Sequence, residues 1–322
     1  MSGGVDRGVP GLSGERALVT GGAGFIGSHI CRALLEAGAS VCVIDDLSTG
    51  RRERVPGGVE FIEASVLDER AMARAVAGCS VVFHKAAMVS VVQSVEEPQR
   101  CMDVNVQGTL RVLKAGREAG VGRVVRASSA AVYGGEPSLP SVETDPVDCW
   151  SPYAMSKAAS EQLCRSYSMC YGLSTASLRY FNVYGPGQDA KSAYAAVISA
   201  FADRLSRGVA PVIHGDGGQT RDFVFVEDVA RANLLAGWCE RELLGEAINI
   251  GTGRAVSLLE LFGQMRAVMG ADVEPSFGPA RAGDVRHSRA AVDRAEALIG
   301  FRAGTALTDG LGRTMSRSGE LL

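Results

Sequence analysis

The stretch TGGAGFIGSH, near the start of the chain, constrains the fold more than any other segment. Its glycines Gly21, Gly24 and Gly27 are spaced G-x-x-G-x-x-G, and they stand between a run that predicts a strand and a segment that predicts a helix. Glycine lets an anion approach the backbone closely, and the free N–H groups and dipole of a helix N-terminus favour a diphosphate. The loop therefore predicts a nucleotide-binding strand–loop–helix unit, the alternative being a turn that merely requires glycine.

An acidic residue ends the next predicted strand. Asp45 closes the run SVCVID, at the distance from the glycine loop expected for a carboxylate that binds the hydroxyls of an adenosine ribose. A carboxylate there would repel a 2′-phosphate, so the sequence favours NAD over NADP. Arg51 and Arg52 follow closely and keep NADP open as an alternative.

The first half of the chain alternates short β-rich runs with helical patterns. Near-continuous apolar strands separated by helices indicate a parallel sheet that is covered on both faces. We therefore expect an α/β fold, with a Rossmann-like doubly wound parallel sheet and a smaller C-terminal α/β substrate-binding lobe. The predicted strands are 16–20, 40–45, 59–63, 80–84, 123–129 and 174–181, and the predicted helices are 25–37, 68–77, 98–119 and 153–171.

The pattern changes after about residue 182. RDFVFVEDVARANLLAGWC predicts a strand, a turn and a helix, and EAINIGTG predicts a further strand. SLLELFGQMRAVMG predicts a helix, because Ser257 and Glu260 have capping-box spacing and Gly270 marks the end. We assign residues 1–14 to a flexible leader, 15–181 joined by parts of about 222–251 to an NAD-binding Rossmann domain, and 182–322 mainly to a substrate-binding lobe.

Composition argues against several classes of protein. The formal net charge is −3, and the one basic cluster, GRRER, is interpreted as a solvated loop, so neither nucleic acid nor membrane is an expected partner. The longest apolar run, AYAAVISAFA, is far below the ~20 residues that a membrane span needs. The eight cysteines include no CxxC pair, so we expect reduced, mostly buried thiols, no metal site and a cytoplasmic location.

The stretch SPYAMSKAAS places Tyr153 and Lys157 four residues apart, after a proline that suits the start of a helix. Residues at this spacing share one face of a helix. The two are either a surface pair of no consequence or a phenol held beside an ammonium for proton chemistry. An unperturbed phenol has a pKa of about 10. A nearby ammonium and a positive nicotinamide ring would both lower that pKa.

Together these motifs resemble the extended short-chain dehydrogenase/reductase family, and within it the nucleotide-sugar 4-epimerases. The resemblance runs from about residue 15 to residue 300, through TGGAGFIG, DDLSTG, HKAA, NVQGT, SSAAVYG, YAMSK, RYFNVYGPGQ, GQTRDFVFVEDV and RAGDVRHS in that order. It implies an NAD-dependent enzyme of UDP-sugar metabolism, an isomerase. In it Tyr153 is the acid/base, Lys157 is its partner, and Ser129 relays the proton of the sugar 4-hydroxyl.

The resemblance also implies binding residues. For the cofactor they are Gly21, Gly24, Phe25, Ile26, Gly27, Asp45, Asp46, Ser48, Thr49, Gly50, Ser65, Val66, Ala86, Ala87, Asn105, Ser128, Tyr153, Lys157 and Tyr180. For the substrate they are Ser129, Tyr153, Asn182, Ala195, Ala196, Val197, Arg221, Arg281, Asp284 and Ser288. In this set Arg221 and Arg281 clamp the substrate diphosphate and Asp284 binds the nucleotide ribose. Asn105 is interpreted as an anchor of the loops around the cofactor, although an asparagine inside a helix could be purely structural.

Ala130 and Ala131 narrow the expected reaction. Relatives that dehydrate or decarboxylate sugars carry an acid here, ahead of the tyrosine of the VYG element, and alanine cannot act as a base. The resemblance then implies oxidation at C4 to a transient 4-keto sugar, and return of the same hydride to the opposite face. A nucleotide-sugar dehydratase, a decarboxylase, a net reductase and a non-catalytic dinucleotide-binding protein are the less favoured hypotheses.

The sugar is predicted from single positions. Ser288 is small where glucose-selective 4-epimerases resemble one another in carrying tyrosine, which leaves room for a 2-acetamido group. We expect UDP-GlcNAc/UDP-GalNAc and/or UDP-Glc/UDP-Gal as substrates. Gln93 stands where acetamido-sugar epimerases often carry arginine, which weakens the first pair. Lys191 could serve the carboxylate of UDP-glucuronate, so a UDP-glucuronate 4-epimerase is the alternative.

Three residues depart from the pattern of the family, and the resemblance also implies an oligomeric state. Ala64 and Ser65 replace a Gly-Asp pair that contacts adenine in the family, and Lys85 replaces a usually apolar or amide residue and is assigned no role. The predicted helices 98–119 and 153–171 correspond to the usual dimer face of the family. A homodimer is therefore expected.

Overall fold

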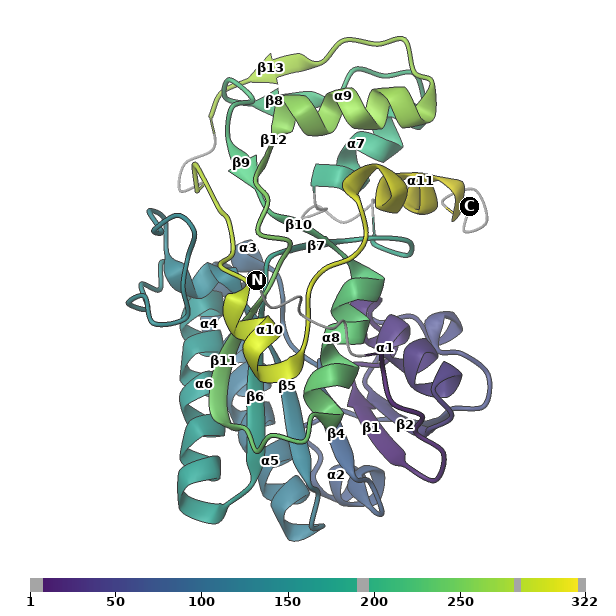
Figure 1. Ribbon diagram of the computed structural model, residues 1–322, viewed down its shortest axis with the longest axis vertical. Helices are drawn as coiled ribbons and strands as arrows, with labels where there is room; N and C mark the ends of the chain where they lie inside the picture. The colour runs from purple at the N-terminus through teal and green to yellow at the C-terminus, as the bar shows by residue number, and fades with distance from the viewer. Residues whose placement is uncertain (1–7, 190–196, 281–284, 318–322) are drawn as a thin grey trace.

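Seven strands form one parallel sheet at the centre of the protein, in the order β11-β6-β5-β4-β1-β2-β3 (Figure 1). The computed structural model describes residues 8–189, 197–280 and 285–317. The strands are β1 (Arg16–Thr20), β2 (Ser40–Asp45), β3 (Glu60–Glu63), β4 (Val81–His84), β5 (Arg123–Ser129), β6 (Ser174–Tyr180) and β11 (Leu244–Ile250). The predicted α/β Rossmann-like architecture is confirmed, and its edge strand β11 comes from the second half of the chain.

Helices cover both faces of the sheet. Helices α1 (Phe25–Glu36) and α8 (Val226–Trp238) pack on one face, and α2 (Glu69–Val76), α5 (Gly108–Glu118) and α6 (Pro152–Tyr171) pack on the other. Successive strand residues alternate between the two cores, so that Val19 packs on the α1 side and Leu18 on the α2 side. Because both faces are buried, the strands read as continuous apolar runs, which is the pattern that predicted them.

The predicted helix over 98–119 is not continuous. It consists of α4 (Pro98–Met102), a π-helical turn η2 (Asp103–Gln107) and α5, and it follows the short helix α3 (Val91–Glu96), which the sequence did not predict. Asn105 lies buried in the π-helical turn, and its carbonyl oxygen accepts hydrogen bonds from the hydroxyls of Thr109 and Ser160, at 2.6 and 3.0 Å. The two hydroxyls thus bind the backbone carbonyl oxygen of Asn105 within the π-helical turn.

The rest of the second half builds a smaller lobe beyond the carboxyl ends of the strands (Figure 1). Its strands pair two by two as β10 with β7, β12 with β9 and β13 with β8. Their bounds are β7 (Asn182–Tyr184), β8 (Val212–His214), β9 (Thr220–Arg221), β10 (Phe223–Phe225), β12 (Val256–Ser257) and β13 (Ser276–Gly278). Helices α7 (Val197–Ser206), α9 (Leu258–Met269) and α11 (Leu307–Arg317) share one apolar core with them, and α10 (Asp293–Ile299) packs beside β11 and α8.

Helix α9 begins and ends as its sequence predicted. Ser257 and Glu260 form both bonds of a capping box, and Gly270 ends the helix in the left-handed conformation with φ of 59°. The eight cysteines are free thiols, five of them buried, as expected. Within the described residues, every helix is too short or too polar to cross a bilayer.

Candidate active site

The glycine loop lies between the end of β1 and the start of α1. Gly21 has φ of 69°, and a Cβ there would come within 2.6 Å of the Ala86 nitrogen. A Cβ on Gly27 would meet the Gly21 carbonyl oxygen at 2.2 Å. Ala86 and its neighbour Ala87 follow β4, so the loop packs directly against the carboxyl end of that strand. Only glycine fits this packing.

The N-terminus of α1 suits a diphosphate. Gly24 is the N-cap, and Phe25 and Ile26 open the first turn. No side chain in the described chain caps this end, and the first turn carries no acidic residue. The positive end of the helix dipole is therefore uncompensated, which is the donor set that an anionic phosphate group needs.

Asp45 is held at the carboxyl end of β2. One of its carboxylate oxygens accepts the Ala23 N–H and the other accepts the Leu47 N–H, both at 2.9 Å. Burial raises the pKa of Asp45, and these two hydrogen bonds oppose that rise. A Cβ on Gly50 would lie 2.9 Å from the Asp45 carboxylate, so glycine leaves space at this acid.

Arg51 and Arg52, the two arginines behind the NADP alternative, both contact other side chains in the structure. Arg51 pairs with Asp189 at 3.6 Å, and the Arg52 guanidinium lies 4.2 Å from the centre of the Phe61 ring. Asp46 accepts the Ser48 N–H at 3.0 Å, and Thr49 follows it in this loop. The geometry favours the ribose hydroxyls over a 2′-phosphate.

Ser65 and Val66 lie just beyond the carboxyl end of β3. The Ser65 hydroxyl accepts the Leu67 N–H at 3.3 Å, and Val66 is buried against Gly108 at the start of α5. Both stand at the edge of the sheet nearest β2. The structure thus places them on the side of Asp45, where the adenine end of a dinucleotide is expected.

Tyr153 and Lys157 lie on the first two turns of α6. Ser151 caps this helix, and its hydroxyl accepts the Ala154 N–H at 3.1 Å. The Lys157 ammonium nitrogen lies 5.5 Å from the centre of the Tyr153 ring and donates to the Ala127 carbonyl oxygen at 3.2 Å. Lys157 is buried, Tyr153 is half-buried, and the Lys157 ammonium reaches β5, so the two are not a surface pair.

Ser129 ends β5 and faces this pair. Its hydroxyl accepts the Ala131 N–H at 3.1 Å and also engages Tyr153 in a hydrogen bond that favours the phenolate. Burial nevertheless raises the pKa of Tyr153, whereas the sequence predicted a lowered value. The prediction was wrong in sign for the protein alone, because desolvation outweighs the opposing effects of Ser129 and the Arg126 charge.

Lys157 titrates in an unusual range. Burial first, and the Arg126 charge second, lower its pKa to about 7. A phenolate one turn away would favour the ammonium form of Lys157, and that ammonium would in turn favour the phenolate. Such a pair can exchange a proton with a substrate hydroxyl.

Ser128 and Asn105 hold the site in place. The Ser128 hydroxyl donates to Glu161 at 2.5 Å, and Glu161 also accepts two hydrogen bonds from the Arg179 guanidinium, at 3.0 and 2.7 Å. Asn105 exchanges two hydrogen bonds with the Met88 backbone and donates to the Ser156 hydroxyl at 2.8 Å. It thus ties the loop after β4 to α6, as an anchoring role requires.

A second group of predicted residues lines a cavity of about 330 Å³ in the smaller lobe. Asn182, Val197 and Arg221 contribute to its wall, together with His214 and Gln219. Ser288 is half-buried nearby, and its N–H donates to the Thr220 carbonyl oxygen at 3.1 Å. Ala195, Ala196, Arg281, Asp284 and Lys191 lie outside the described residues.

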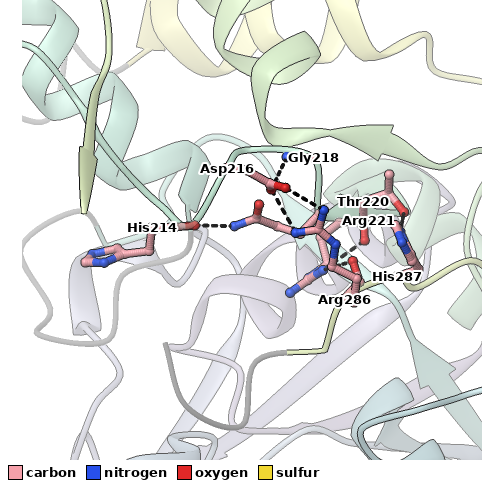
Figure 2. A network of polar contacts seen from close by, with 8 residues as sticks. His214, Asp216, Gly218, Thr220, Arg221, Arg286 and His287 are labelled. Carbon is pink, nitrogen blue, oxygen red and sulfur yellow. Dashed lines mark hydrogen bonds and ion pairs between the residues drawn. The ribbon is translucent and has the colours of Figure 1, made fainter. Parts of the chain in front are cut away.

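Arg221 belongs to a polar network that joins β9 to the segment before Ser288 (Figure 2). Its guanidinium donates to the Thr220 carbonyl oxygen at 2.9 Å, and the neighbouring Arg286 binds Asp216 through two bonds of 2.8 Å. His287 meets the Thr220 hydroxyl at 3.0 Å. The network holds a fork-shaped cationic donor at the cavity, which suits an anionic phosphate group.

Three functional candidates escaped the sequence reasoning. Buried Asp222 accepts the N–H groups of Thr252, Gly253 and Ala290, and so fixes the chain next to Arg221. In the sequence, only its position directly after Arg221 pointed to Asp222. Glu161 had no signal beyond its helical spacing from Lys157, and Arg126 had none.

Residues 17–251 match the NAD dependent epimerase/dehydratase family. The UDP-glucose 4-epimerase of Mycolicibacterium smegmatis is 40% identical over 307 residues, which cover 93% of this chain and 97% of that protein. A UDP-N-acetyl-alpha-D-glucosaminuronate decarboxylase of Bacillus cytotoxicus is 35% identical over 257 residues, 77% of this chain and 78% of that protein.

Solved structures agree over nearly the whole chain. The UDP-N-acetylglucosamine 4-epimerase from Methanobrevibacter ruminantium, in complex with UDP-N-acetylmuramic acid, superposes with a TM-score of 0.92 at 34% identity, over 97% of this chain and 100% of that one. The UDP-glucose 4-epimerase of Thermotoga maritima with UDP-glucose superposes with a TM-score of 0.90 at 39% identity, over 95% and 99%.

Proposed function

Because the chain belongs to the NAD dependent epimerase/dehydratase family, as an NAD-dependent UDP-sugar 4-epimerase, we propose that it interconverts UDP-N-acetylglucosamine or UDP-glucose with the corresponding galacto epimer. The observation that carries the reaction type is the group of Ser129, Tyr153 and Lys157 at the end of β5. Ala130 and Ala131 follow Ser129 directly and offer no carboxylate. This pattern supports epimerisation over the decarboxylation that one relative performs.

Proton transfer is assigned to Ser129 and Tyr153. The proton of the sugar 4-hydroxyl passes through the Ser129 hydroxyl to the Tyr153 phenolate, and it returns by the same route when the 4-keto group is reduced. Lys157, one turn away, stabilises the phenolate by its charge. Bound NAD would supply the acceptor and donor of the C4 hydride.

Cofactor binding is assigned to the ends of the central strands. The bare N-terminus of α1 would bind the diphosphate, and Asp45 would bind the adenosine ribose. Tyr180 is buried, and its hydroxyl is bonded to Asn233, so it shapes the floor below the reacting groups. These groups are fixed by the sheet, which suits a cofactor that stays bound through each cycle.

Substrate binding is assigned to the smaller lobe. Arg221 would hold the UDP diphosphate, with Asn182 beside it in the cavity wall. If the diphosphate stays fixed, the sugar can turn about its linkage and present either face to the same reacting groups. The diphosphate site must therefore bind tightly, whereas the sugar site must accept two orientations of the sugar.

The choice of sugar rests on Ser288 and Gln93. The small side chain of Ser288 supports a 2-acetamido substituent. The Gln93 amide donates to Glu97 at 3.1 Å, so it is turned toward its own helix. The proposal is tested by incubating the protein separately with UDP-glucose, UDP-N-acetylglucosamine and UDP-glucuronate and reading the products by NMR. We expect galacto products from the first two.

The outcomes separate the alternatives. A galacto product from UDP-glucuronate alone would replace the proposed substrates with the glucuronate pair. Release of CO₂ or water would refute epimerisation. Purified protein should also contain NAD, and none should be consumed over many turnovers.

The proposed assembly is a homodimer through α5 and α6. Met155, Met169 and Tyr171 of α6 are more than half exposed, which is unfavourable for an isolated helix face. Light scattering should give twice the mass of the 33.6 kDa chain, and a monomer at micromolar concentration would contradict the proposal.

A further inference from the structure

Lys85 is a half-buried cation that the proposed mechanism does not use. It directly follows β4, and its ammonium nitrogen donates to the Val125 carbonyl oxygen at 3.2 Å and to the Tyr180 hydroxyl at 3.1 Å. The Tyr180 hydroxyl is bonded in turn to Asn233 of α8. Lys85 therefore reaches under the ends of β5 and β6 from the α8 side of the sheet.

Two more cations surround this position. Arg126 of β5 is 2% exposed, and its Nη1 atom has no hydrogen-bond partner within the described residues. Lys157 of α6 is 4% exposed and donates to the carbonyl of Ala127 on the same strand. Glu161, an acid of α6, is already bound by Arg179. Among the described residues, Lys85 has no ion-pair partner.

A partly buried lysine without an anion beside it is costly. Burial first, then the charges of Lys157 and Arg126, hold the pKa of Lys85 well below its usual range, with the Cys164 thiol of α6 opposing weakly. The other groups around it are the Tyr180 hydroxyl, the Asn233 amide and the neighbouring His84, whose pKa is held well below its usual range by burial first and by charges that include Lys85. An apolar side chain would avoid this cost. A lysine at this position therefore suggests a functional role that offsets its energetic cost.

The position of Lys85 suggests one. Lys157 and Lys85 bond to carbonyls two residues apart on β5, and Tyr180 pairs in register with Ser129, so Lys85 lies behind the reacting groups. An oxidised nicotinamide ring is positive and a reduced ring is neutral. A cation within several ångströms disfavours the oxidised ring and leaves the reduced ring almost unaffected.

We propose that Lys85 acts electrostatically on the nicotinamide site, where its ammonium group makes bound NAD a stronger hydride acceptor. The inference rests on NAD binding and not on which UDP-sugar is the substrate. Each hydride that enters the ring removes its positive charge, so it also favours uptake of a proton by neutral Lys85. Reduction of the cofactor and protonation of Lys85 are therefore linked.

The test measures the reduction potential of the bound cofactor. Purified enzyme with its NAD is equilibrated with a dithionite-poised viologen mediator, and the fraction of NADH is read at 340 nm. For Lys85→Met we expect an NADH/NAD⁺ ratio about tenfold lower than in the wild type at pH 6, or ~30 mV for this two-electron couple. Lys85→Arg should keep most of the wild-type ratio.

The effect should fade with rising pH. Below the Lys85 pKa in both redox states, the wild type carries the charge and differs fully from Lys85→Met. Above both values the lysine is neutral, and the two proteins converge. The wild-type potential should therefore fall more steeply with pH between these limits than the Lys85→Met potential does.

Controls keep the outcomes distinct. Lys114→Met removes an exposed lysine from α5 and should leave the potential unchanged. Thermal unfolding and NAD content of Lys85→Met verify that the fold and the site persist. Equal potentials for the wild type and Lys85→Met at pH 6 would overturn the inference, as would a difference that persists unchanged to pH 10. The substrate assignment is unaffected by either result.

Discussion

The ion pair of Glu161 and Arg179 offers a quantitative test of how the catalytic strand end is held. Both side chains are about 95% buried, at 5% and 4% exposure, and two hydrogen bonds of 3.0 and 2.7 Å join them. Glu161 also accepts the Ser128 hydroxyl, and the Arg179 guanidinium lies 4.9 Å from the centre of the Tyr133 ring. Glu161→Gln keeps the shape and removes the negative charge.

The expected loss follows from the charge that remains. Glu161→Gln leaves the Arg179 guanidinium buried without a counter-ion, which costs about 3–5 kcal/mol of unfolding free energy. Replacing both partners, as Glu161→Leu with Arg179→Met, removes both charges and leaves only the Ser128 hydroxyl and backbone groups short of a partner. We expect that double variant to lose no more than about 2 kcal/mol.

Urea unfolding of the NAD-loaded protein, followed by circular dichroism, measures these differences. The matched control is Asp203→Asn, which breaks the exposed i,i+4 pair with Arg207 and should cost about 0–1 kcal/mol. The reasoning is refuted if Glu161→Gln costs no more than this control. It is also refuted if the double variant loses as much as its component single variants, Glu161→Leu and Arg179→Met, lose together.

Three further predictions concern the chemistry. Tyr153→Phe should lower kcat by about 10²–10⁴-fold while NAD content and thermal stability persist, and retained turnover would remove Tyr153 from the proton path. Asp45→Ala should weaken NAD binding about tenfold or more in calorimetry, because a ribose acceptor and the partner of two backbone N–H groups are lost; unchanged affinity would contradict that role. Asp222→Asn should raise KM for the UDP-sugar several-fold with NAD content unchanged, because the loop beside Arg221 loosens. A change confined to kcat would argue against this account.

The parts of the fold that depend on local sequence patterns could be predicted. The strands of the sheet, the glycine loop and the Ser257–Glu260 cap depend on residues close in sequence, and the structure places them as expected. The helix over 98–119 was predicted as continuous because its apolar spacing continues through the π-helical turn. The turn contains Asn105, whose hydrogen-bond partners Met88 and Ser156 are distant in sequence.

The electrostatic state of the site was the least predictable part. Spacing placed Tyr153 beside Lys157, and that proximity alone predicted a lowered phenol pKa. The structure adds burial, which raises the pKa of Tyr153 and lowers the pKa of Lys157. Periodicity does not reveal how far a side chain is desolvated, nor that Arg126 reaches the same place from another strand.

The two halves of the site differ in how they are held, and this difference bears on the reaction. Ser129, Tyr153 and Lys157 are attached to a central strand and to the helix packed on it. Arg221 is attached to a two-residue strand, held by a few hydrogen bonds to neighbouring loops. A 4-epimerase needs one fixed centre that removes and returns the hydride, and a sugar that turns between the two events. Substitutions around β5 should therefore act mainly on kcat and on the cofactor potential, whereas substitutions around β9 should act mainly on KM and on the choice of sugar.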